Sequence, residues 1–310
     1  MTTGIETLKQ NLKGVVVIFM TPFHDDLRLH EKAAARNLRF LISKGIRTGQ
    51  GAIVVAGSIG ECYALTNDER KRLAETVVAE ARGEVPVLIG CNHSATAAAV
   101  DLAKHAEKIG ADGLMLLPPS YATPPERKVY EWYRAVAAET SLGIMVYNNP
   151  LMVPVDISVD LLQKMADTIP NIIAVKECSE NICRLDEGYG RLRPRLVMIN
   201  GNCEEDEPCA TLRGAAGYTT CIANFAPTLC LDLYFACRDR QWDRAWELHW
   251  KLMPAIKFMG RMFGDFRCFI KIAQELLGLQ GGPVRPPALS PTPEDRQTVE
   301  RLVKELGLTS

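Results

Sequence analysis

The hydrophobic residues of this chain fall into eight short apolar runs, with longer amphipathic stretches between most of them. The runs lie at residues 15–20, 52–56, 85–89, 113–117, 142–147, 172–176, 195–200 and 216–222. The intervening sequence predicts helices at residues 31–44, 67–82, 95–109, 125–139 and 159–168. Runs that are apolar throughout, rather than at alternate positions, are typical of strands covered on both faces. The alternation therefore predicts parallel strands joined by crossover helices.

This pattern predicts an α/β fold, the (β/α)8 TIM barrel, although a doubly wound open sheet has a similar pattern. After the eighth run the pattern changes, and residues 226–277 predict three helices rich in aromatic residues. Two glycines and three prolines at 281–287 predict an irregular connector, and a last helix is expected at 293–306. We therefore expect a barrel at residues 1–224 and a C-terminal helical extension at residues 225–310.

Composition narrows the class of partner to a small molecule. The formal net charge is -1 at pH 7, so the chain has no basic field for nucleic acid. No apolar run is long enough to cross a bilayer, and the N-terminus lacks the pattern of a secretory signal. The 10 cysteines contain no Cys-x-x-Cys pair, so we expect thiols packed as small apolar groups in a reducing cytoplasm.

No metal or cofactor is expected either. The 5 histidines include no pair at metal-ligand spacing. The sequence also lacks a phosphate loop and a nicotinamide-binding fingerprint. Any catalysis is therefore expected to use side chains alone.

Loops that follow the strands build the active site of such a barrel, so residues at strand ends hold favoured positions. Three predicted strand ends carry distinctive side chains: Gly57-Ser58-Ile59-Gly60-Glu61, Tyr147-Asn148-Asn149-Pro150 and Lys176-Glu177. An amine such as that of Lys176, once deprotonated in a dry pocket, can attack a carbonyl and form a Schiff base. A salt bridge with Glu177 at the barrel rim is the alternative interpretation. We favour chemistry because the three strand ends occur in register.

The other two strand ends fit the same chemistry. The glycines around Ser58 and Ile59 allow a tight turn whose N–H groups can bind a carboxylate, although such a turn is commonly only a turn. The phenol of Tyr147 has an ordinary pKa of about 10, close enough to that of an amine to exchange protons with a carbinolamine. A buried structural tyrosine is the alternative there.

Taken together, these residues resemble the dihydrodipicolinate synthase and N-acetylneuraminate lyase superfamily of class I lyases, over nearly the whole chain. The turn from Gly57 to Glu61 is similar to the family's Gly-Thr-Thr-Gly-Glu signature, and Tyr147 to Pro150 is similar to its Tyr-Asn-x-Pro. Val175 to Glu177 is similar to its Schiff-base lysine motif, and Ala223-Asn224 to the end of its eighth-strand motif. The segment Leu117 to Pro124 is similar to its Pro-Tyr-Tyr-x-x-Pro.

The resemblance implies that Lys176 forms an imine with pyruvate or a related 2-oxo acid, while Tyr147 moves protons. It implies that Ser58 and the Ile59 amide hold the substrate carboxylate, and that Ser58 links two tyrosines in a proton relay. Tyr121 is the candidate for the second tyrosine, which reaches across a subunit interface in a homo-oligomer, a dimer of dimers. Two further candidates complete the substrate-binding set: Met152 and Thr219.

Departures from the family motifs affect the expected substrate. Dihydrodipicolinate synthases carry an arginine two residues after the Tyr-Asn-x-Pro proline, where this chain has Met152. A thioether cannot form a bidentate pair with a carboxylate. Ile59 also replaces the second threonine of the signature, so a more apolar second-substrate site is expected. We predict an aldolase-type lyase that makes or releases pyruvate, rather than a dihydrodipicolinate synthase.

Two alternatives stay open. Residues 147–150, 175–179 and 284–287 are similar to a branch that deaminates hydroxylated pyrroline carboxylates, whereas residues 57–65 are similar to hydratase-aldolases. The first alternative is therefore a dehydratase or deaminase that acts on a hydroxylated 2-oxo acid or pyrroline carboxylate through the same imine. The second is a non-catalytic, lyase-like protein that binds a ligand.

Overall fold

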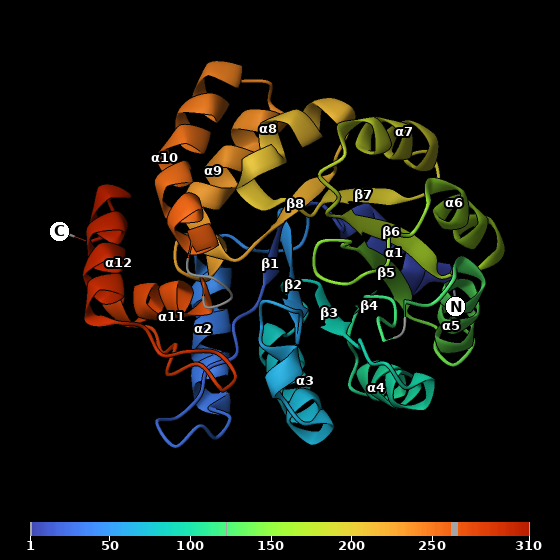
Figure 1. The fold of residues 1–310 in the computed structure, drawn as a ribbon, viewed down its shortest axis with the longest axis horizontal. Helices are drawn as coiled ribbons and strands as arrows, with labels where there is room; N and C mark the ends of the chain where they lie inside the picture. Colours follow the sequence, from blue (N-terminus) through green and yellow to red (C-terminus); the bar gives the residue numbers. More distant parts are fainter. Residues whose placement is uncertain (1, 122, 262–265, 310) are drawn as a thin grey trace.

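The computed structural model describes residues 2–121, 123–261 and 266–309. Eight parallel strands close into one barrel in chain order, as Figure 1 shows. The strands are β1 (Gly14–Ile18), β2 (Gly51–Val55), β3 (Val87–Gly90), β4 (Gly113–Leu116), β5 (Gly143–Asn148), β6 (Ile172–Glu177), β7 (Val197–Asn200) and β8 (Gly217–Thr220). Closure occurs where β1 pairs in parallel with β8, Gly14 opposite Gly217. The barrel prediction is confirmed, and the open sheet is wrong.

Helices follow the strands and form the outer layer of the barrel (Figure 1). These helices are α2 (Glu31–Ser43), α3 (Asn67–Ala81), α4 (Thr96–Lys108), α5 (Glu126–Ala137), α6 (Val159–Thr168), α7 (Ile182–Leu192) and α8 (Cys203–Arg213). The start of α3 is typical of how the sequence sets these boundaries. The Thr66 side chain accepts a hydrogen bond from the Glu69 N–H, and the Glu69 carboxylate accepts one from the Thr66 N–H.

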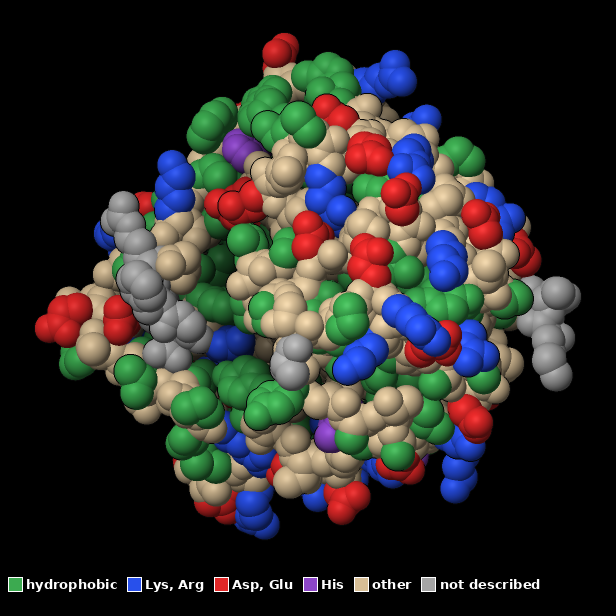
Figure 2. Space-filling view, turned by 45° about the vertical axis from the view of Figure 1, so that its right-hand side comes forward, with side chains coloured by type: hydrophobic (Ala, Val, Ile, Leu, Met, Phe, Trp, Pro, Cys, Tyr) green, Lys and Arg blue, Asp and Glu red, His purple; other side chains and the backbone are tan. Residues whose placement is uncertain are grey.

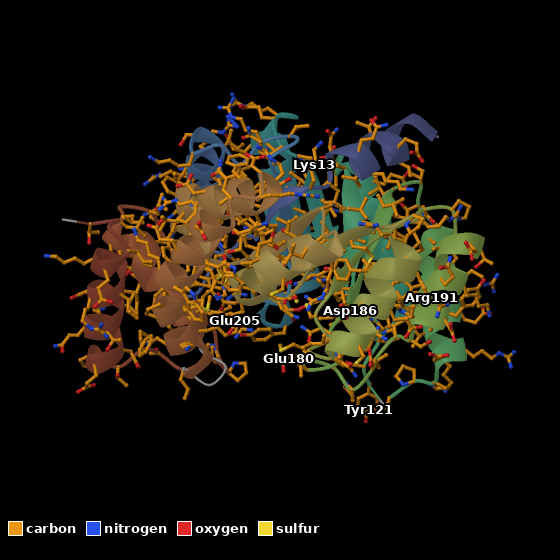
Figure 3. The ribbon with its side chains drawn as sticks, turned by 90° about the horizontal axis from the view of Figure 1, so that it is seen from above. Lys13, Tyr121, Glu180, Asp186, Arg191 and Glu205 are labelled. Atoms are coloured by element: carbon orange, nitrogen blue, oxygen red, sulfur yellow. The ribbon has the colours of Figure 1, made fainter. Side chains whose placement is uncertain are left out.

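A helix that the apolar pattern did not predict, α1 (Thr2–Asn11), covers the amino-terminal end of the barrel. Its Leu8 and Leu12 are buried in the same cluster as interior strand residues such as Val16. A Cβ atom at Gly113 would lie 2.5 Å from Leu8 Cδ2, so glycine makes room for the helix. Figure 3 shows α1 on the side of the molecule opposite Tyr121. Any active site must therefore open at the carboxyl ends of the strands.

Each strand alternates between the two faces of the barrel wall, although its sequence is apolar throughout. Val16 and Ile18 of β1 pack in the barrel interior, whereas Val15 and Val17 pack in the layer between strands and helices. Ala174 of β6 lies in the interior cluster. Because side chains alternate along a strand, Lys176 also points inward.

In the described part of the chain, four α-helices follow β8: α9 (Pro227–Arg238), α10 (Trp242–Arg261), α11 (Phe266–Leu276) and α12 (Pro293–Glu305). The first three correspond to the helices predicted for residues 226–277. Helix α9 packs against β1 and β8, in the position of an eighth barrel helix, and α12 packs against α10 and α11 (Figure 1). The division between residues 224 and 225 stays a prediction. None of the helices in the described part of the chain combines the length and apolarity needed to span a bilayer.

Candidate active site

Lys176 and Tyr147 form the centre of the site. They are register partners on the adjacent strands β6 and β5. The Lys176 Nζ lies 3.9 Å from the centroid of the Tyr147 ring. Lys176 is 3% exposed and Tyr147 is 4% exposed, so the contact is shielded from water. An ammonium group is attracted to the face of an aromatic ring, and more strongly when both are desolvated.

Glu177 points to the opposite face of β6 and does not pair with Lys176. Its carboxylate accepts hydrogen bonds from Asn148 Nδ2 at 3.0 Å and from the Ser179 N–H at 2.8 Å. Arg184 Nη2 lies 3.2 Å from the same carboxylate. The rim salt bridge between Lys176 and Glu177 is therefore a wrong interpretation, because successive side chains on a strand leave opposite faces.

Two opposing effects act on the pKa of Lys176. Burial acts to lower it, but interaction with the ionised forms of Tyr147, Cys178 and Cys203 acts the other way, and the pKa lies above its ordinary value. Burial raises the pKa of Tyr147. Asn149 Nδ2 donates to the Tyr147 hydroxyl at 2.7 Å. The pKa of each group is therefore shifted upward, toward its protonated form.

The turn after β2 is fixed by close backbone packing. A Cβ atom at Gly60 would lie 2.5 Å from the Phe19 carbonyl oxygen, and one at Gly57 would lie 2.9 Å from an Ile18 methyl. The Thr21 hydroxyl donates to the Gly60 carbonyl at 2.6 Å. Close approach therefore excludes a side chain at Gly60 and crowds one at Gly57.

Two of the predicted binding residues lie at the barrel interior. Thr219 of β8 is fully buried, and its hydroxyl donates to the Asn200 carbonyl at 3.4 Å. Ile59 packs against the interior cluster that contains Tyr147. Ser58 is half-buried, and its carbonyl accepts from Arg267 at 3.4 Å.

Met152 and Tyr121 lie further out. The Met152 side chain is 57% exposed, and its N–H donates to the Asn149 side chain at 3.1 Å. Tyr121 is 86% exposed and lies at the edge of the carboxyl face in Figure 3. Within one chain, therefore, neither side chain is brought to Lys176.

Three thiols near Lys176 were missed as site residues by the sequence reasoning. Cys178 and Cys221 are buried, and Cys203 is partly buried with a left-handed backbone at φ 56. Burial raises the pKa of Cys178 to about 11 and that of Cys221 to about 12, so both remain thiols at neutral pH. Cys178 was within reach of prediction, because it follows Lys176 by two residues. Nothing in the sequence connects Cys203 and Cys221 with the lysine.

The described residues form no metal site, and the face drawn in Figure 2 carries no field of one charge. No group of three or more His, Cys, Asp or Glu side chains within the described ranges is arranged to hold a metal ion. Figure 2 shows basic and acidic side chains interspersed over the face it displays, which also carries a recess. A small ligand suits such a surface better than a polyanion does.

A closed barrel with a buried lysine beside a tyrosine at its carboxyl face defines an aldolase-type class I lyase. The model of the Dihydrodipicolinate synthetase family matches residues 11–306. The chain belongs to that family and is a lyase.

Characterised relatives match the chain over almost its full length. It is 31% identical over 301 residues to a 4-hydroxy-tetrahydrodipicolinate synthase of Bartonella henselae, covering 96% of this chain and 99% of the relative. The similar enzyme of Methanopyrus kandleri is 29% identical over 298 residues, covering 96% and 97%.

Solved structures agree with these relatives. Dihydrodipicolinate synthase from Aquifex aeolicus has a TM-score of 0.89 at 30% identity, covering 96% of this chain and 99% of that one. YagE from E. coli K12, a family member described in complex with pyruvate, has a TM-score of 0.89 at 27% identity, with the same coverage. A chain described as a monomeric dihydrodipicolinate synthase variant has a TM-score of 0.88 at 24% identity, covering 97% and 99%. The shared fold therefore does not by itself determine the number of subunits.

Proposed function

We propose that Lys176 forms a Schiff base with pyruvate or a related 2-oxo acid, and that the enzyme catalyses aldol-type cleavage or condensation through it. The observation that carries the proposal is the buried Lys176 Nζ, 3.9 Å from the centre of the Tyr147 ring. An amine and a phenol in contact, both shielded from water, supply the nucleophile and the proton carrier of imine chemistry.

The reaction follows from these two groups. The Lys176 ammonium gives up one proton to water, and its amine attacks C2 of the 2-oxo acid. Tyr147 donates its proton to the developing alkoxide and takes one back from the nitrogen, giving the carbinolamine. Tyr147 then protonates the hydroxyl, water leaves as the iminium forms, and the phenolate regains its proton from water.

In cleavage the C4 hydroxyl loses its proton, the bond from C3 to C4 breaks with its electrons drawn to the iminium, and the second carbonyl compound leaves. The enamine that remains gains a proton at C3, and water hydrolyses the imine to release pyruvate. In condensation the pyruvate imine loses a C3 proton, the enamine adds to the second carbonyl compound, and hydrolysis releases the longer 2-oxo acid.

The N–H groups of the turn around Ser58 and Ile59 bind the carboxylate of the 2-oxo acid. The fixed shape of the turn supports this role, because a carboxylate gains most from donors that need no rearrangement. Thr219 lines the buried wall of the same site. The second carbonyl compound carries an apolar group, since Ile59 and Met152 offer it no cation. Synthesis of dihydrodipicolinate is not proposed for this reason.

Tyr121 completes the relay from a neighbouring subunit in a homo-oligomer. Its 86% exposure supports this assignment, because an exposed aromatic side chain on the carboxyl face is free to enter a partner. The dimer of dimers implied by the family resemblance stays part of the proposal.

Reductive trapping tests the proposal. The protein is incubated with pyruvate and borohydride, and intact mass followed by peptide mapping locates the adduct. An adduct on Lys176, absent from Lys176→Met, is expected. No adduct at saturating 2-oxo acid would favour the non-catalytic alternative. A lactate dehydrogenase assay on candidate substrates then separates the enzymes, because a dehydratase or deaminase releases no pyruvate.

A further inference from the structure

A second buried lysine lies outside the proposed chemistry. Lys271 of α11 pairs with Glu61 of the turn after β2, with Nζ 2.6 Å from Oε1, and the two side chains are 2% and 0% exposed. Lys271 Nζ also donates to the Pro283 carbonyl at 2.7 Å and lies 4.4 Å from the centre of the Phe23 ring. The pair therefore joins the C-terminal helices to the loop that carries Ser58.

The connector at residues 281–287 holds the other oxygen of the same carboxylate. The Arg285 N–H donates to Glu61 Oε2 at 3.1 Å. The Arg285 guanidinium donates to the Ala64 carbonyl at 2.8 Å and to the Leu27 carbonyl at 2.6 Å, and it pairs with Glu69 at 2.6 Å. Glu61 is thus in contact through both oxygens, by an ion pair on Oε1 and a hydrogen bond on Oε2, with residues more than 200 positions away in the sequence.

These contacts hold a backbone conformation that Glu61 does not favour by itself. Its φ is 60°, in the left-handed region that residues other than glycine rarely adopt. The residue follows Gly60 directly, so its backbone sets the direction of the turn on which Ser58 and Ile59 lie. A strained conformation persists only where its surroundings enforce it, and such positions concentrate at ligand sites.

Stability alone is a poor explanation for the pair. A buried ion pair recovers little of the cost of removing two charges from water, and an apolar pair of similar volume is commonly as stable. What such a pair does contribute is one defined geometry. Here that geometry belongs to the turn that faces the substrate carboxylate.

We infer that Lys271, Glu61 and Arg285 form a brace of positioning residues, which orients the N–H groups of the Ser58–Ile59 turn toward the carboxylate of the 2-oxo acid. The inference rests on the proposed function, because the carboxylate is that of the proposed substrate. It makes the C-terminal helices part of the substrate-binding machinery, although they supply no group to the imine.

The test measures pyruvate affinity in a variant that removes both charges. Glu61→Gln combined with Lys271→Met leaves no unpaired ion in the interior and is expected to fold. Borohydride trapping across a range of pyruvate concentrations gives the half-saturating concentration. We expect it to rise about tenfold or more, since a small misplacement of binding groups has effects of this size. Complete labelling of Lys176 at saturation is expected to remain.

The matched control changes an exposed pair that joins α11 to α12. Glu275 and Arg296 lie 3.5 Å apart with side chains 40% and 48% exposed, and they do not reach the turn. Glu275→Gln with Arg296→Met is expected to trap pyruvate as the wild type does. A folded brace variant whose half-saturating concentration stays within twofold of the control would overturn the inference while leaving the proposed function intact. Wild-type protein that forms no adduct would overturn both.

If the brace variant does not fold, a measurement on the wild-type protein tests the inference instead. Amide hydrogen exchange is followed with and without pyruvate in peptides that cover residues 57–65 and 280–290. The brace requires that pyruvate slow exchange in both peptides together. Protection of the first peptide alone would contradict it.

Discussion

At the scale of single residues, the main result is the contact between the buried side chains of Lys176 and Tyr147. Sequence reasoning identified both residues and their contact at one barrel end, because strand-end position and motif order are visible in the sequence. It made the chemistry conditional on Lys176 losing its proton in a dry pocket. The structure adds interaction with the ionised forms of Tyr147 and the nearby cysteines, which raises that pKa overall. Such a balance depends on contacts between strands and cannot be obtained from residue types alone.

The raised pKa of Lys176 predicts how imine formation depends on pH. The reactive, unprotonated amine is the minor form of Lys176 at neutral pH. While the pH stays below the pKa of Lys176, each increase of one pH unit raises that fraction up to tenfold. The initial rate of trapping at low pyruvate should therefore rise steadily between about pH 7 and pH 9. Stopped-flow absorbance of the imine measures this rate. A flat profile would mean that Lys176 is already neutral in the resting enzyme.

Two carboxyl groups behind β8 predict a pH dependence of stability. Burial raises the pKa of Glu207 to about 8 and that of Glu204 to about 7. The folded state therefore retains protons that the unfolded state loses above about pH 4.5, so their contribution to stability falls as pH rises from about 4.5 to 8. Urea unfolding at several pH values should show this decline, and Glu207→Gln should make it shallower. If the free energy of unfolding fell with pH as steeply in that variant as in the wild type, the raised pKa of Glu207 would not be its cause. Glu247→Gln, on the exposed face of α10, serves as the control.

At the scale of elements, the sequence predicted the strands and the five helices α2 to α6 within a few residues. Their apolar periodicity and caps are local signals. Helix α1 was not predicted, because its first turn is polar and the helix is stabilised by tertiary contacts with the barrel floor. The brace from α11 to the turn after β2 was equally invisible, since Lys271 and Glu61 are 210 residues apart in number and no local pattern links them.

The role of α1 can be tested at Leu8. This side chain is 4% exposed and packs over Gly113 and Gly143 at the barrel floor. Leu8→Ala should lower the free energy of unfolding by about 3 kcal/mol, because it removes buried methyl groups and leaves a cavity. Urea denaturation measures the loss, and Gln10→Ala on the exposed side should change stability little. Retained trapping of pyruvate by folded Leu8→Ala is expected, and its loss would show that the two ends of the barrel are coupled.

At the scale of the whole molecule, the proposed relay is incomplete within the described chain. Lys176, Tyr147, Ile59 and Thr219 lie at the barrel interior, whereas Tyr121 projects from the carboxyl face. The sequence identified Tyr121 only through the family resemblance. Its place in an assembly depends on a partner surface that a single chain does not contain.

Mixed oligomers test whether Tyr121 acts across an interface. Tyr121→Phe and Lys176→Met should each lose catalysis, by about a hundredfold or more in the first case. After random mixing, about half of the dimers contain one subunit of each variant. Each of these hybrids has one complete site out of two, so activity should recover to about a quarter of the wild-type value. Pyruvate release after co-refolding measures the recovery. No recovery, despite mass-spectrometric proof of hybrids, would place Tyr121 outside the relay of a neighbouring site.

The helix across the barrel floor has a further consequence for the order of events in catalysis. Because α1 closes one end, everything that reaches Lys176 enters and leaves by the opposite mouth. In the proposed reaction the 2-oxo acid is tethered deepest, so the second carbonyl compound stands between it and solvent. Cleavage then releases its products in a fixed order: the aldehyde or ketone leaves first, and pyruvate leaves last. In the reverse direction the same passage makes pyruvate the obligatory first arrival, and an excess of the second compound obstructs it.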